Sequence, residues 1–344
     1  MPWAPATSPY PPVEAAAAER LRTVDGAYVS PFERGEMRLV EGRRRWIRGA
    51  VHDADDVLLP GSQRVAGDPE SPVAVDPTIV RRRKDVKDLD GTWLYGGHWM
   101  THFGHFLVET LTTLWADPTE RPDGLLLHRS YQGADPQHRK GVLLSPEPRE
   151  WQATFLDLAG FGGLPIRVVQ DRPVTPERII VAARPLVFKA CAGPDAVAAW
   201  ERVAAATDQP GRGSTGRVFL SRSAFHQTRD SPKRVRSTEG WDTALDTAFA
   251  TAGFAVVHPE TLPLVEQIRL TRGAEVLAGA SGSALHLSAF AGTGTRVIEV
   301  GDDRFSDAPG LTQRVIDAAR GHTTSFVPYG PPESVAPALA ELDL

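Results

Sequence analysis

Short apolar runs alternate with helix-length segments through the second half of the chain. The runs have the length of strands. Regular alternation of this kind predicts a parallel, doubly wound sheet with helices on both faces. The predicted strands are 217–220, 254–257, 275–277, 296–300 and 324–327, and the predicted helices are 241–252, 264–272, 283–291, 311–320 and 333–342.

A similar β/α alternation begins at Thr92 in the first half. Gly160 is predicted to end a helix there by a left-handed turn. Residues 24–86 hold short apolar segments broken by Gly, Pro, Asp and basic runs, which predicts strands and solvated loops. The predicted strands of this half are 93–95, 124–127, 142–144, 166–169 and 178–181, and the predicted helices are 103–115 and 151–158.

The length of 344 residues is about twice that of a usual single domain, which favours two domains. Residues 184–190 are the candidate crossing between the halves, and 209–216 is a predicted loop after the helix at 195–206. The expected organisation is a disordered proline-rich tail at 1–20, an N-terminal α/β domain at 21–185, and a C-terminal domain at 186–344.

Composition excludes several classes of protein. The net charge of -5 argues against nucleic acid as a partner. The single cysteine, Cys191, cannot form a disulfide within the chain, which favours a cytoplasmic location. No apolar stretch approaches the roughly 18 residues of a membrane span, so membrane association is at most peripheral. The richness in alanine and arginine resembles bacterial coding bias, and the oligomeric state is left open.

A basic loop follows the predicted strand 217–220. In an open parallel sheet, ligands bind beyond the carboxyl ends of the strands. A diphosphate would find both charge and bidentate donors in this loop, although a solvated surface loop is the alternative. After Ser221, the cationic residues and histidine of the loop are Arg222, His226, Arg229, Lys233, Arg234 and Arg236.

A turn of small residues follows the strand 275–277 and leads into a predicted helix. Backbone N–H groups around Gly282, helped by the Ser281 and Ser283 hydroxyls, are suited to bind phosphate at the positive end of the helix dipole. The alternative is that glycine permits a tight turn and serine caps the helix. After strand 254–257, Glu260 is a candidate acceptor for ribose hydroxyls, or a helix cap.

The first half holds a dense group of histidines. His105 and Glu109 lie one turn apart on the predicted helix, so the carboxylate can orient the imidazole as a general base that accepts the proton of a hydroxyl. His98 and His102 are acceptor-side candidates. A metal site is disfavoured because no nearby Asp or Cys completes it and the spacing is not H-E-x-x-H. A core role for His105 is the remaining alternative.

In their order along the chain, these segments resemble glycosyltransferase family 61. The resemblance implies a GT-B-like α/β fold of two Rossmann-like domains facing a central cleft, and an inverting reaction without an essential metal. It also implies that the C-terminal domain at 186–344 is the Rossmann-like domain that binds the nucleotide sugar, and that the N-terminal domain at 21–185 lies on the acceptor side. The matching segments are 103–109, 155–161, 219–222, 253–268, 279–290 and 294–299.

Two positions depart from the family pattern. The family commonly has Asn-Glu where this chain has Thr238 and Glu239, and His-Gly where it has Ser281 and Gly282. Arg222, Arg234 and Glu239 fit the first motif, although Arg234 and Arg236 are both compatible with one of its positions.

The resemblance implies a bacterial hexosyl- or pentosyltransferase of polysaccharide biosynthesis. It would move a sugar from a UDP-linked or other nucleotide-sugar donor to a saccharide or other hydroxyl-bearing acceptor, with no cofactor. His105 would act as base with Glu109, while Arg222, Arg234 and residues 281–283 stabilise the leaving diphosphate. Two alternatives remain: a catalytically degenerate nucleotide- or glycan-binding protein, favoured by Ser281, and another transferase on the same fold, such as a pyruvyl or phosphosugar transferase.

Overall fold

The computed structural model divides the chain into two compact units, and the division falls between Trp200 and Glu201, inside α4 (Pro194–Ala205). Each unit is described by itself, and the expected GT-B-like arrangement stays a prediction, as do the predicted domain bounds. The structure describes residues 20–30, 33–40, 43–48, 50–59, 61–62, 64, 85–117, 121–129, 147–170, 172–207, 216–226 and 236–342.

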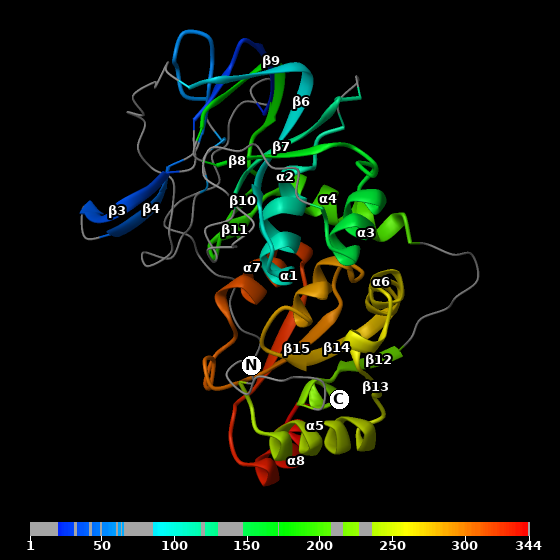
Figure 1. The fold of residues 1–344 in the computed structure, drawn as a ribbon. Coiled ribbons are helices and arrows are strands. Elements are labelled where there is room, and N and C mark those ends of the chain that lie inside the picture. Colours follow the sequence, from blue (N-terminus) through cyan, green and yellow to red (C-terminus); the bar gives the residue numbers. More distant parts are fainter. Residues whose placement is uncertain are drawn as a thin grey trace. The chain divides into compact units, whose positions relative to one another are not determined.

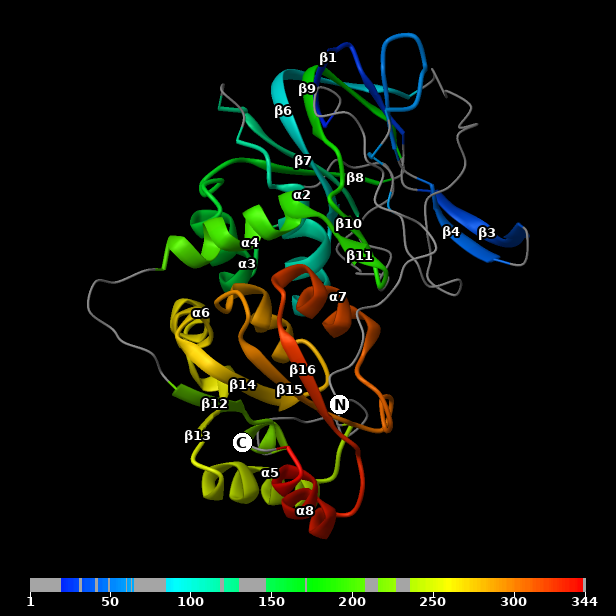
Figure 2. The ribbon, with the colours of Figure 1, turned by 180° about the vertical axis from the view of Figure 1, so that it is seen from behind.

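The C-terminal unit contains a parallel sheet with the strand order β13-β12-β14-β15-β16 (Figure 1). Helices lie on both faces, so the predicted doubly wound sheet is confirmed (Figures 1 and 2). The strands are β12 (Gly216–Leu220), β13 (Ala255–Val257), β14 (Ala274–Ala280), β15 (Arg296–Val300) and β16 (Thr323–Val327). The helices are η3 (Ser223–His226), α5 (Glu239–Thr251), η5 (Pro259–Thr261), α6 (Leu264–Arg272), η6 (Leu285–Phe290), α7 (Leu311–Arg320), η7 (Pro332–Ser334) and α8 (Val335–Ala340).

The apolar face of α5 anchors one side of this sheet. Trp241, Leu245 and Phe249 recur every four residues, so they lie along one stripe of the helix, and all three are buried. The ring of Phe249 stacks on that of Phe219 from β12, with the centroids 4.1 Å apart. This packing holds α5 against β12, the strand that precedes the predicted basic loop.

The strand order creates a topological switch point between β12 and β14. From β12 the chain continues to β13 on one side, whereas from β14 it continues to β15 on the other. The loops that leave the carboxyl ends of β12 and β14 therefore diverge, and such a point is where open α/β sheets bind ligands. The register pairs Leu220 with Gly279, so the two strands end at nearly the same level.

The N-terminal unit has a mixed sheet with the order β5-β2-β9-β6-β7-β8 and with β1 also paired to β9. The strands β6 to β9 pair in parallel with one another, as the β/α pattern predicted. The strands β1, β2 and β5 pair antiparallel, whereas the expected Rossmann-like domain has a parallel sheet. They come from residues 21–52, where no helix-length crossover separates the strands. The bounds are β1 (Leu21–Asp25), β2 (Tyr28–Val29), β5 (Val51–His52), β6 (Lys87–Trp99), β7 (Gly124–Arg129), β8 (Ile166–Val169) and β9 (Val174–Ala182).

Two short hairpins and the helix α3 also belong to this unit. The hairpins pair β3 (Glu33–Val40) with β4 (Arg43–Arg48), and β10 (Leu186–Val187) with β11 (Cys191–Ala192). The helix α3 (Glu150–Leu158) agrees with the predicted 151–158, and Gly160 follows it with φ of +87°, the predicted left-handed turn.

The helix that carries His105 is confirmed, but it is not regular. It runs as α1 (Phe103–His105), the π-helical turn η2 (Phe106–Thr110) and α2 (Leu111–Thr113). A π turn leaves carbonyl groups without their usual partners, and the Leu107 carbonyl accepts a hydrogen bond from Trp200 Nε1 at 3.1 Å. π turns occur often at functional sites.

Some predictions about elements are wrong or fall outside the described residues. The helix predicted at 283–291 is the shorter 3₁₀ helix η6, and β14 continues to Ala280, three residues beyond the predicted end. The strand continues because its ladder with β15 extends to the pair Ala280 and Val300. The closing helix predicted at 333–342 is η7 followed by α8. The predicted strand at 142–144, nearly all of the tail at 1–20 and most of the loop at 209–216 lie outside the described residues.

Within the described residues, the structure contains no helix long and apolar enough to cross a membrane.

A buried carboxylate in the C-terminal unit makes folding depend on pH. Asp317 of α7 accepts hydrogen bonds from Gln313 Nε2 at 2.8 Å and Thr324 Oγ1 at 2.9 Å. Burial raises its pKa from 3.8 to about 7, although these two hydrogen bonds oppose the change. The folded state therefore prefers the protonated form, whose stabilising contribution is full below pH 4 and is lost as the pH rises to about 7.

We expect Asp317→Asn, which stays neutral, to gain thermal stability relative to the wild type as the pH rises. The difference in Tm between variant and wild type should shift in favour of the variant by at least about 2 °C between pH 5 and pH 8. Differential scanning fluorimetry measures it, with the exposed Asp307→Asn as control. A Tm difference between variant and wild type that does not change with pH would contradict the raised pKa of Asp317.

Candidate functional site

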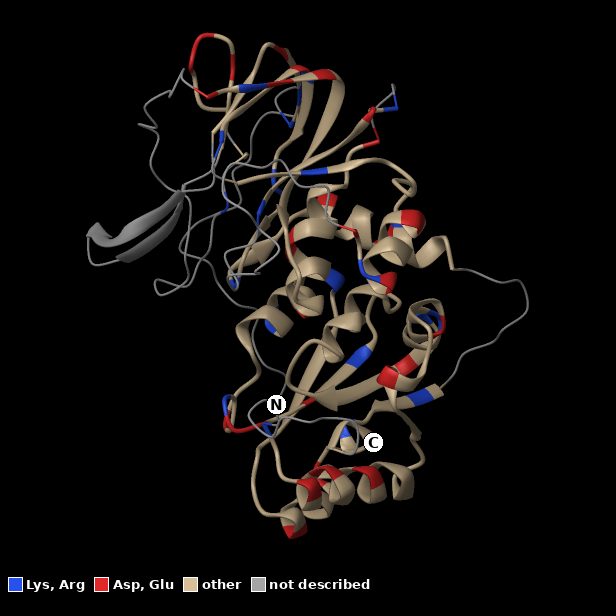
Figure 3. Ribbon diagram, viewed as in Figure 1, with Lys and Arg blue, Asp and Glu red and all other residues tan. Residues whose placement is uncertain are grey.

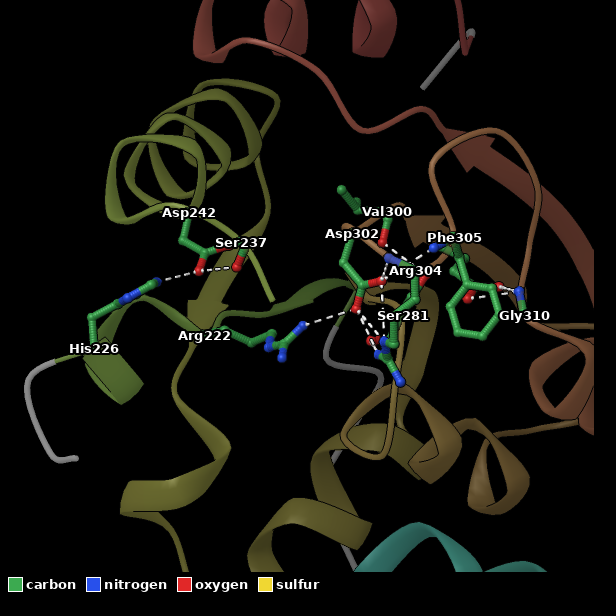
Figure 4. Close-up of polar contacts among 11 residues, drawn as sticks. Arg222, His226, Ser237, Asp242, Ser281, Val300, Asp302, Arg304, Phe305 and Gly310 are labelled. Atoms are coloured by element: carbon green, nitrogen blue, oxygen red, sulfur yellow. Dashed lines mark hydrogen bonds and ion pairs between the residues drawn. The ribbon is translucent and has the colours of Figure 1, made fainter. Parts of the chain in front are cut away.

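Side chains from two strand ends meet around one buried carboxylate in the C-terminal unit. Arg222 follows β12 by two residues, while Asp302 and Arg304 follow β15 by two and four. The Asp302 side chain has no exposed surface. Figure 4 shows Arg222 and Arg304 directed at Asp302 from the two loops. We call Arg222, Asp302, Arg304 and their neighbour Arg236 the arginine site.

Asp302 contacts Arg304 more closely than it contacts Arg222. Arg304 Nη2 donates to Oδ2 at 2.6 Å, and the backbone N of Arg304 donates to Oδ1 at 2.9 Å. Arg222 Nη1 lies 3.7 Å from Oδ2, which is within ion-pair range but too long for a hydrogen bond. That Nη1 atom is buried and has no hydrogen-bond partner among the described residues. Arg222 is therefore held near the carboxylate with hydrogen-bonding capacity to spare.

Arg236 adds a third guanidinium to the arginine site. Its pKa is lowered by partial desolvation first and then by the positive charge of Arg304, with a smaller effect from Arg222, while Asp302 and Asp303 act in the opposite direction. An arginine remains charged at neutral pH even so. The Asp303 backbone N donates to the Arg236 carbonyl at 3.1 Å, which ties the segment before α5 to the loop after β15. Three guanidiniums against the carboxylates of Asp302 and Asp303 leave an excess of positive charge.

The small-residue turn lies at the same sheet edge, but its serine is used internally. Arg304 Nη2 donates to the Ser281 carbonyl at 3.1 Å. The Ser281 backbone N and hydroxyl both donate to the Val300 carbonyl, at 2.7 Å and 3.1 Å. Gly282 has φ of +135°, a conformation that side chains disfavour, and Ser283 is half-buried.

The helix-dipole part of the sequence prediction is wrong. The helix after this turn is a six-residue 3₁₀ helix that begins at Leu285, so no α-helix starts at Ser283. Because the Ser281 donors are satisfied within the sheet, the guanidiniums are the described groups of this edge that are suited to bind an anion. Phosphate contacts of Ser281, Gly282 and Ser283 stay a prediction.

A second carboxylate, Asp242, joins the two described ends of the basic loop. The acidic residues along α5 are visible as red ribbon in Figure 3, and Asp242 is the buried one. Its Oδ2 accepts hydrogen bonds from His226 Nε2 at 2.6 Å and from Ser237 Oγ at 2.7 Å. Next to it, Thr238 caps α5 by accepting from the Trp241 backbone N at 3.2 Å. Threonine thus performs the capping that asparagine also performs well, so the cap is kept at this departure from the family pattern.

Four of the predicted donor-binding residues are not brought into the arginine site by any described contact. Glu239 is the exposed first residue of α5, and Glu260 is exposed on η5. Arg229 and Arg234 lie outside the described residues. Their roles stay predictions.

Glu299 lies at the base of the loop that carries Asp302. The Gly310 backbone N donates to both of its oxygens, at 3.1 Å and 3.2 Å. Burial raises the pKa of Glu299 to about 7, and the nearby Asp317 and Asp302 add to the increase, while the nearby Ser281 hydroxyl and the hydrogen bond from Gly310 oppose it. The contact of Gly310 with Glu299 therefore brings the end of the loop 301–310 back to β15.

The N-terminal unit brings His105 and Glu109 together as predicted. His105 Nδ1 lies 2.6 Å from Glu109 Oε1, and the His105 side chain is 19% exposed. Glu109 is also bound by Arg64, whose Nη2 donates to Oε1 at 3.0 Å and whose Nε donates to Oε2. Burial alone would raise the pKa of Glu109, but the charge of Arg64, together with hydrogen bonds from His105 and Arg64, lowers it to about 2.

The two other histidines of this group differ in exposure. His98 is buried and accepts a hydrogen bond from Arg184 Nη2 at 2.7 Å, and its pKa is well below the usual value, first because of burial and then because of Arg184. Gly97 permits this contact, because a Cβ there would lie 2.7 Å from Arg184 Nη2. His102 is exposed, and its ring lies 5.4 Å from that of His105. The acceptor-side roles of His98 and His102 stay predictions.

Sequence reasoning missed Asp302, Arg304 and Arg64. The rule that ligands bind after strand ends applies equally to the predicted strand 296–300, and it would have indicated the first two. Arg64 carries no comparable signal, since it lies 45 residues before Glu109. Among the described residues, no group of three or more His, Cys, Asp or Glu could hold a metal ion, and the metal independence of the reaction stays a prediction.

Comparison with known proteins identifies one family. The family model for Glycosyltransferase 61 matches residues 103–298, more than half of the chain. The match begins at the first residue of α1 and ends within β15, so it contains His105, Glu109 and Arg222 but not Arg64 or Arg304. No curated protein matches the chain.

The cap at Thr238 can be tested by stability. We expect Thr238→Ala to destabilise the C-terminal unit by about 1 kcal/mol, because the Trp241 backbone N loses its acceptor. Thr238→Asn should remain within about 0.5 kcal/mol of the wild type, since both residues cap well. Urea unfolding followed by tryptophan fluorescence measures the change. Equal stability of the alanine and asparagine variants would show that Thr238 does not act as a cap.

Proposed function

This chain belongs to the glycosyltransferase 61 family, and from that premise we propose that it transfers a sugar from a nucleotide-sugar donor to a hydroxyl group of a saccharide or other small acceptor. Glycosyltransferase activity in general follows from the family. The donor, the acceptor class and the inverting, metal-independent mechanism are the proposed part.

The observation that carries the proposal is the arginine site. It lies at the carboxyl ends of β12 and β15, next to the switch point between β12 and β14. Its excess positive charge suits a diphosphate, and so does the Nη1 of Arg222, which has no hydrogen-bond partner among the residues that the structure describes. The oxygens of a diphosphate accept bidentate hydrogen bonds from guanidinium groups. A UDP-linked sugar is the donor that we expect.

The same residues would assist bond cleavage. As the bond between the anomeric carbon and the donor oxygen breaks, the electron pair and the negative charge move onto the diphosphate. Guanidinium groups already held in place by Asp302 stabilise that charge without large rearrangement. This supports a mechanism in which arginine performs the task that a divalent metal performs in other transferases.

His105 is the proposed general base. The acceptor oxygen forms a bond to the anomeric carbon from the side opposite the leaving diphosphate, and its proton passes to His105 Nε2. Glu109 Oε1 accepts a hydrogen bond from the Nδ1–H of His105, which leaves Nε2 of the imidazole for this task. His105 and the arginine site belong to different units of the chain.

A binding protein without turnover is the second candidate. Where the family commonly has histidine, the Ser281 hydroxyl of this chain donates to the Val300 carbonyl and so is occupied within the protein. Such a protein would bind the donor but never release nucleotide. A panel of nucleotide sugars, each incubated with several acceptors and monitored for nucleotide release, distinguishes the two candidates.

Binding tests the arginine site directly. We expect Arg222→Met to weaken the binding of a nucleoside diphosphate by about 10- to 100-fold, the value of one or two charge-assisted hydrogen bonds. Isothermal titration calorimetry measures the affinity. Arg217→Met is the matched control, because Arg217 lies on the same strand but donates to the Ala252 carbonyl. The proposal fails if the folded wild type binds no nucleotide, or if both variants lose affinity equally.

Catalysis tests the proposed base separately. We expect His105→Gln to lower kcat by about 100-fold or more, because proton transfer by a positioned side chain contributes that much. Its affinity for nucleoside diphosphate should equal that of the wild type, since the arginine site is intact. Steady-state assays and calorimetry on the same preparation provide both values. Wild-type turnover in the variant would remove His105 from the mechanism.

A further inference from the structure

We propose that Arg64 is a positioning residue for the reaction: it fixes Glu109 so that Glu109 holds His105 in the tautomer with the proton on Nδ1 and the lone pair on Nε2. This inference rests on the proposed function, in which His105 accepts the acceptor's proton. Arg64 lies outside residues 103–298, so membership of the family does not assign it this role.

The pair of Arg64 and Glu109 is a fully buried ion pair. Their side chains are 1% and 3% exposed. The guanidinium contacts both carboxylate oxygens, with Nη2 on Oε1 and Nε on Oε2. This two-point contact determines the orientation of the carboxylate as well as its charge.

The charge of Glu109 determines the tautomer of His105. Oε1 accepts from Arg64 Nη2 at 3.0 Å and faces His105 Nδ1 at 2.6 Å. An ionised carboxylate has no proton to donate, so the proton between these two atoms belongs to Nδ1. Neutral His105 then carries its lone pair on Nε2, the atom that a general base requires.

Removal of Arg64 would leave this arrangement without its support. Arg184 also attracts the charge of Glu109, but Arg64 is the guanidinium that contacts the carboxylate. A buried carboxylate that loses its contacting counter-charge is destabilised, and it responds by taking up a proton or by turning toward water. A protonated Glu109 would donate to Nδ1 and reverse the tautomer, and a rotated one would release the imidazole. In both cases Nε2 stops being the reserved proton acceptor.

Phe188 restricts the same two side chains. This buried residue follows β10, and its ring centroid lies 4.9 Å from that of His105 and 5.1 Å from Arg64 Cζ. The guanidinium and the imidazole therefore pack against one aromatic ring while they share one carboxylate. This packing limits rotation of the imidazole, whereas Arg64 and Glu109 decide which nitrogen is protonated.

The test is the tautomer of His105, read by NMR of protein with ¹⁵N- and ¹³C-labelled histidine at about pH 8.5, above the usual range of histidine titration. His105→Gln assigns the resonance. We expect the Nδ1–H form in the wild type and in Arg178→Met, a control that removes the exposed pair of Arg178 with Asp25. In Arg64→Met the Nε2–H form should become substantial.

Kinetics provide the second readout. Arg64→Met should lower kcat by about 10- to 100-fold, as the loss of a supporting contact typically does, with KM within about threefold of the wild type. Arg64→Lys keeps the charge but not the two-point contact, and it should be intermediate in both kcat and tautomer. It also carries the test if Arg64→Met does not fold.

The outcomes separate this inference from the proposed function. A wild type with the Nε2–H form, or a folded Arg64→Met or Arg64→Lys with wild-type tautomer and kcat, would overturn the role of Arg64 while sugar transfer stands. If the wild type transfers no sugar but the tautomer follows Arg64, the positioning by Arg64 is supported and the proposed function fails.

Discussion

A carboxylate taken out of water must find donors inside the protein, and the kind of donor decides its charge. Glu109 faces a guanidinium and an imidazole, and its pKa falls to about 2. Among the described residues, the groups that lower the pKa of Glu299 are neutral, Ser281 and Gly310, and burial raises that pKa to about 7. Burial acts in the same direction on both residues, so the difference comes from the charge of the partners.

The same constraint organises the candidate site in each unit. Asp302 gathers Arg222 and Arg304, while Glu109 gathers Arg64 and His105. In both cases the buried carboxylate holds a neighbouring side chain in place, and that side chain is the one suited to contact a substrate. It is Arg222 beside Asp302 and His105 beside Glu109. Such pairs contribute little net stability, because desolvation offsets their attraction. Their value lies in holding flexible side chains in one orientation before a ligand binds.

Parallel pairing explains why the arginine site forms where it does. The register places Leu220 opposite Gly279 and Ala280 opposite Val300, so the loops after β12, β14 and β15 leave the sheet at one edge. Residues about 80 positions apart in the sequence, such as Arg222 and Arg304, thereby come to share one carboxylate. The contact of Phe219 with Phe249 holds α5 at this edge and with it Asp242, which binds both described ends of the basic loop.

The sequence by itself determined the elements whose signals are local. Strand 296–300, helices 264–272 and 311–320, and the one-turn spacing of His105 and Glu109 all depend on residues near one another in the chain, so their pattern was sufficient. The tertiary structure decided which distant residues join them. The sequence around Ser281 fits a phosphate-binding turn, but in the fold its hydroxyl donates to the Val300 carbonyl. The π turn at 106–110 has no local sequence signal. Arg64, Asp302 and Arg304 gain their roles from burial and charge compensation, and both arise only when the chain folds.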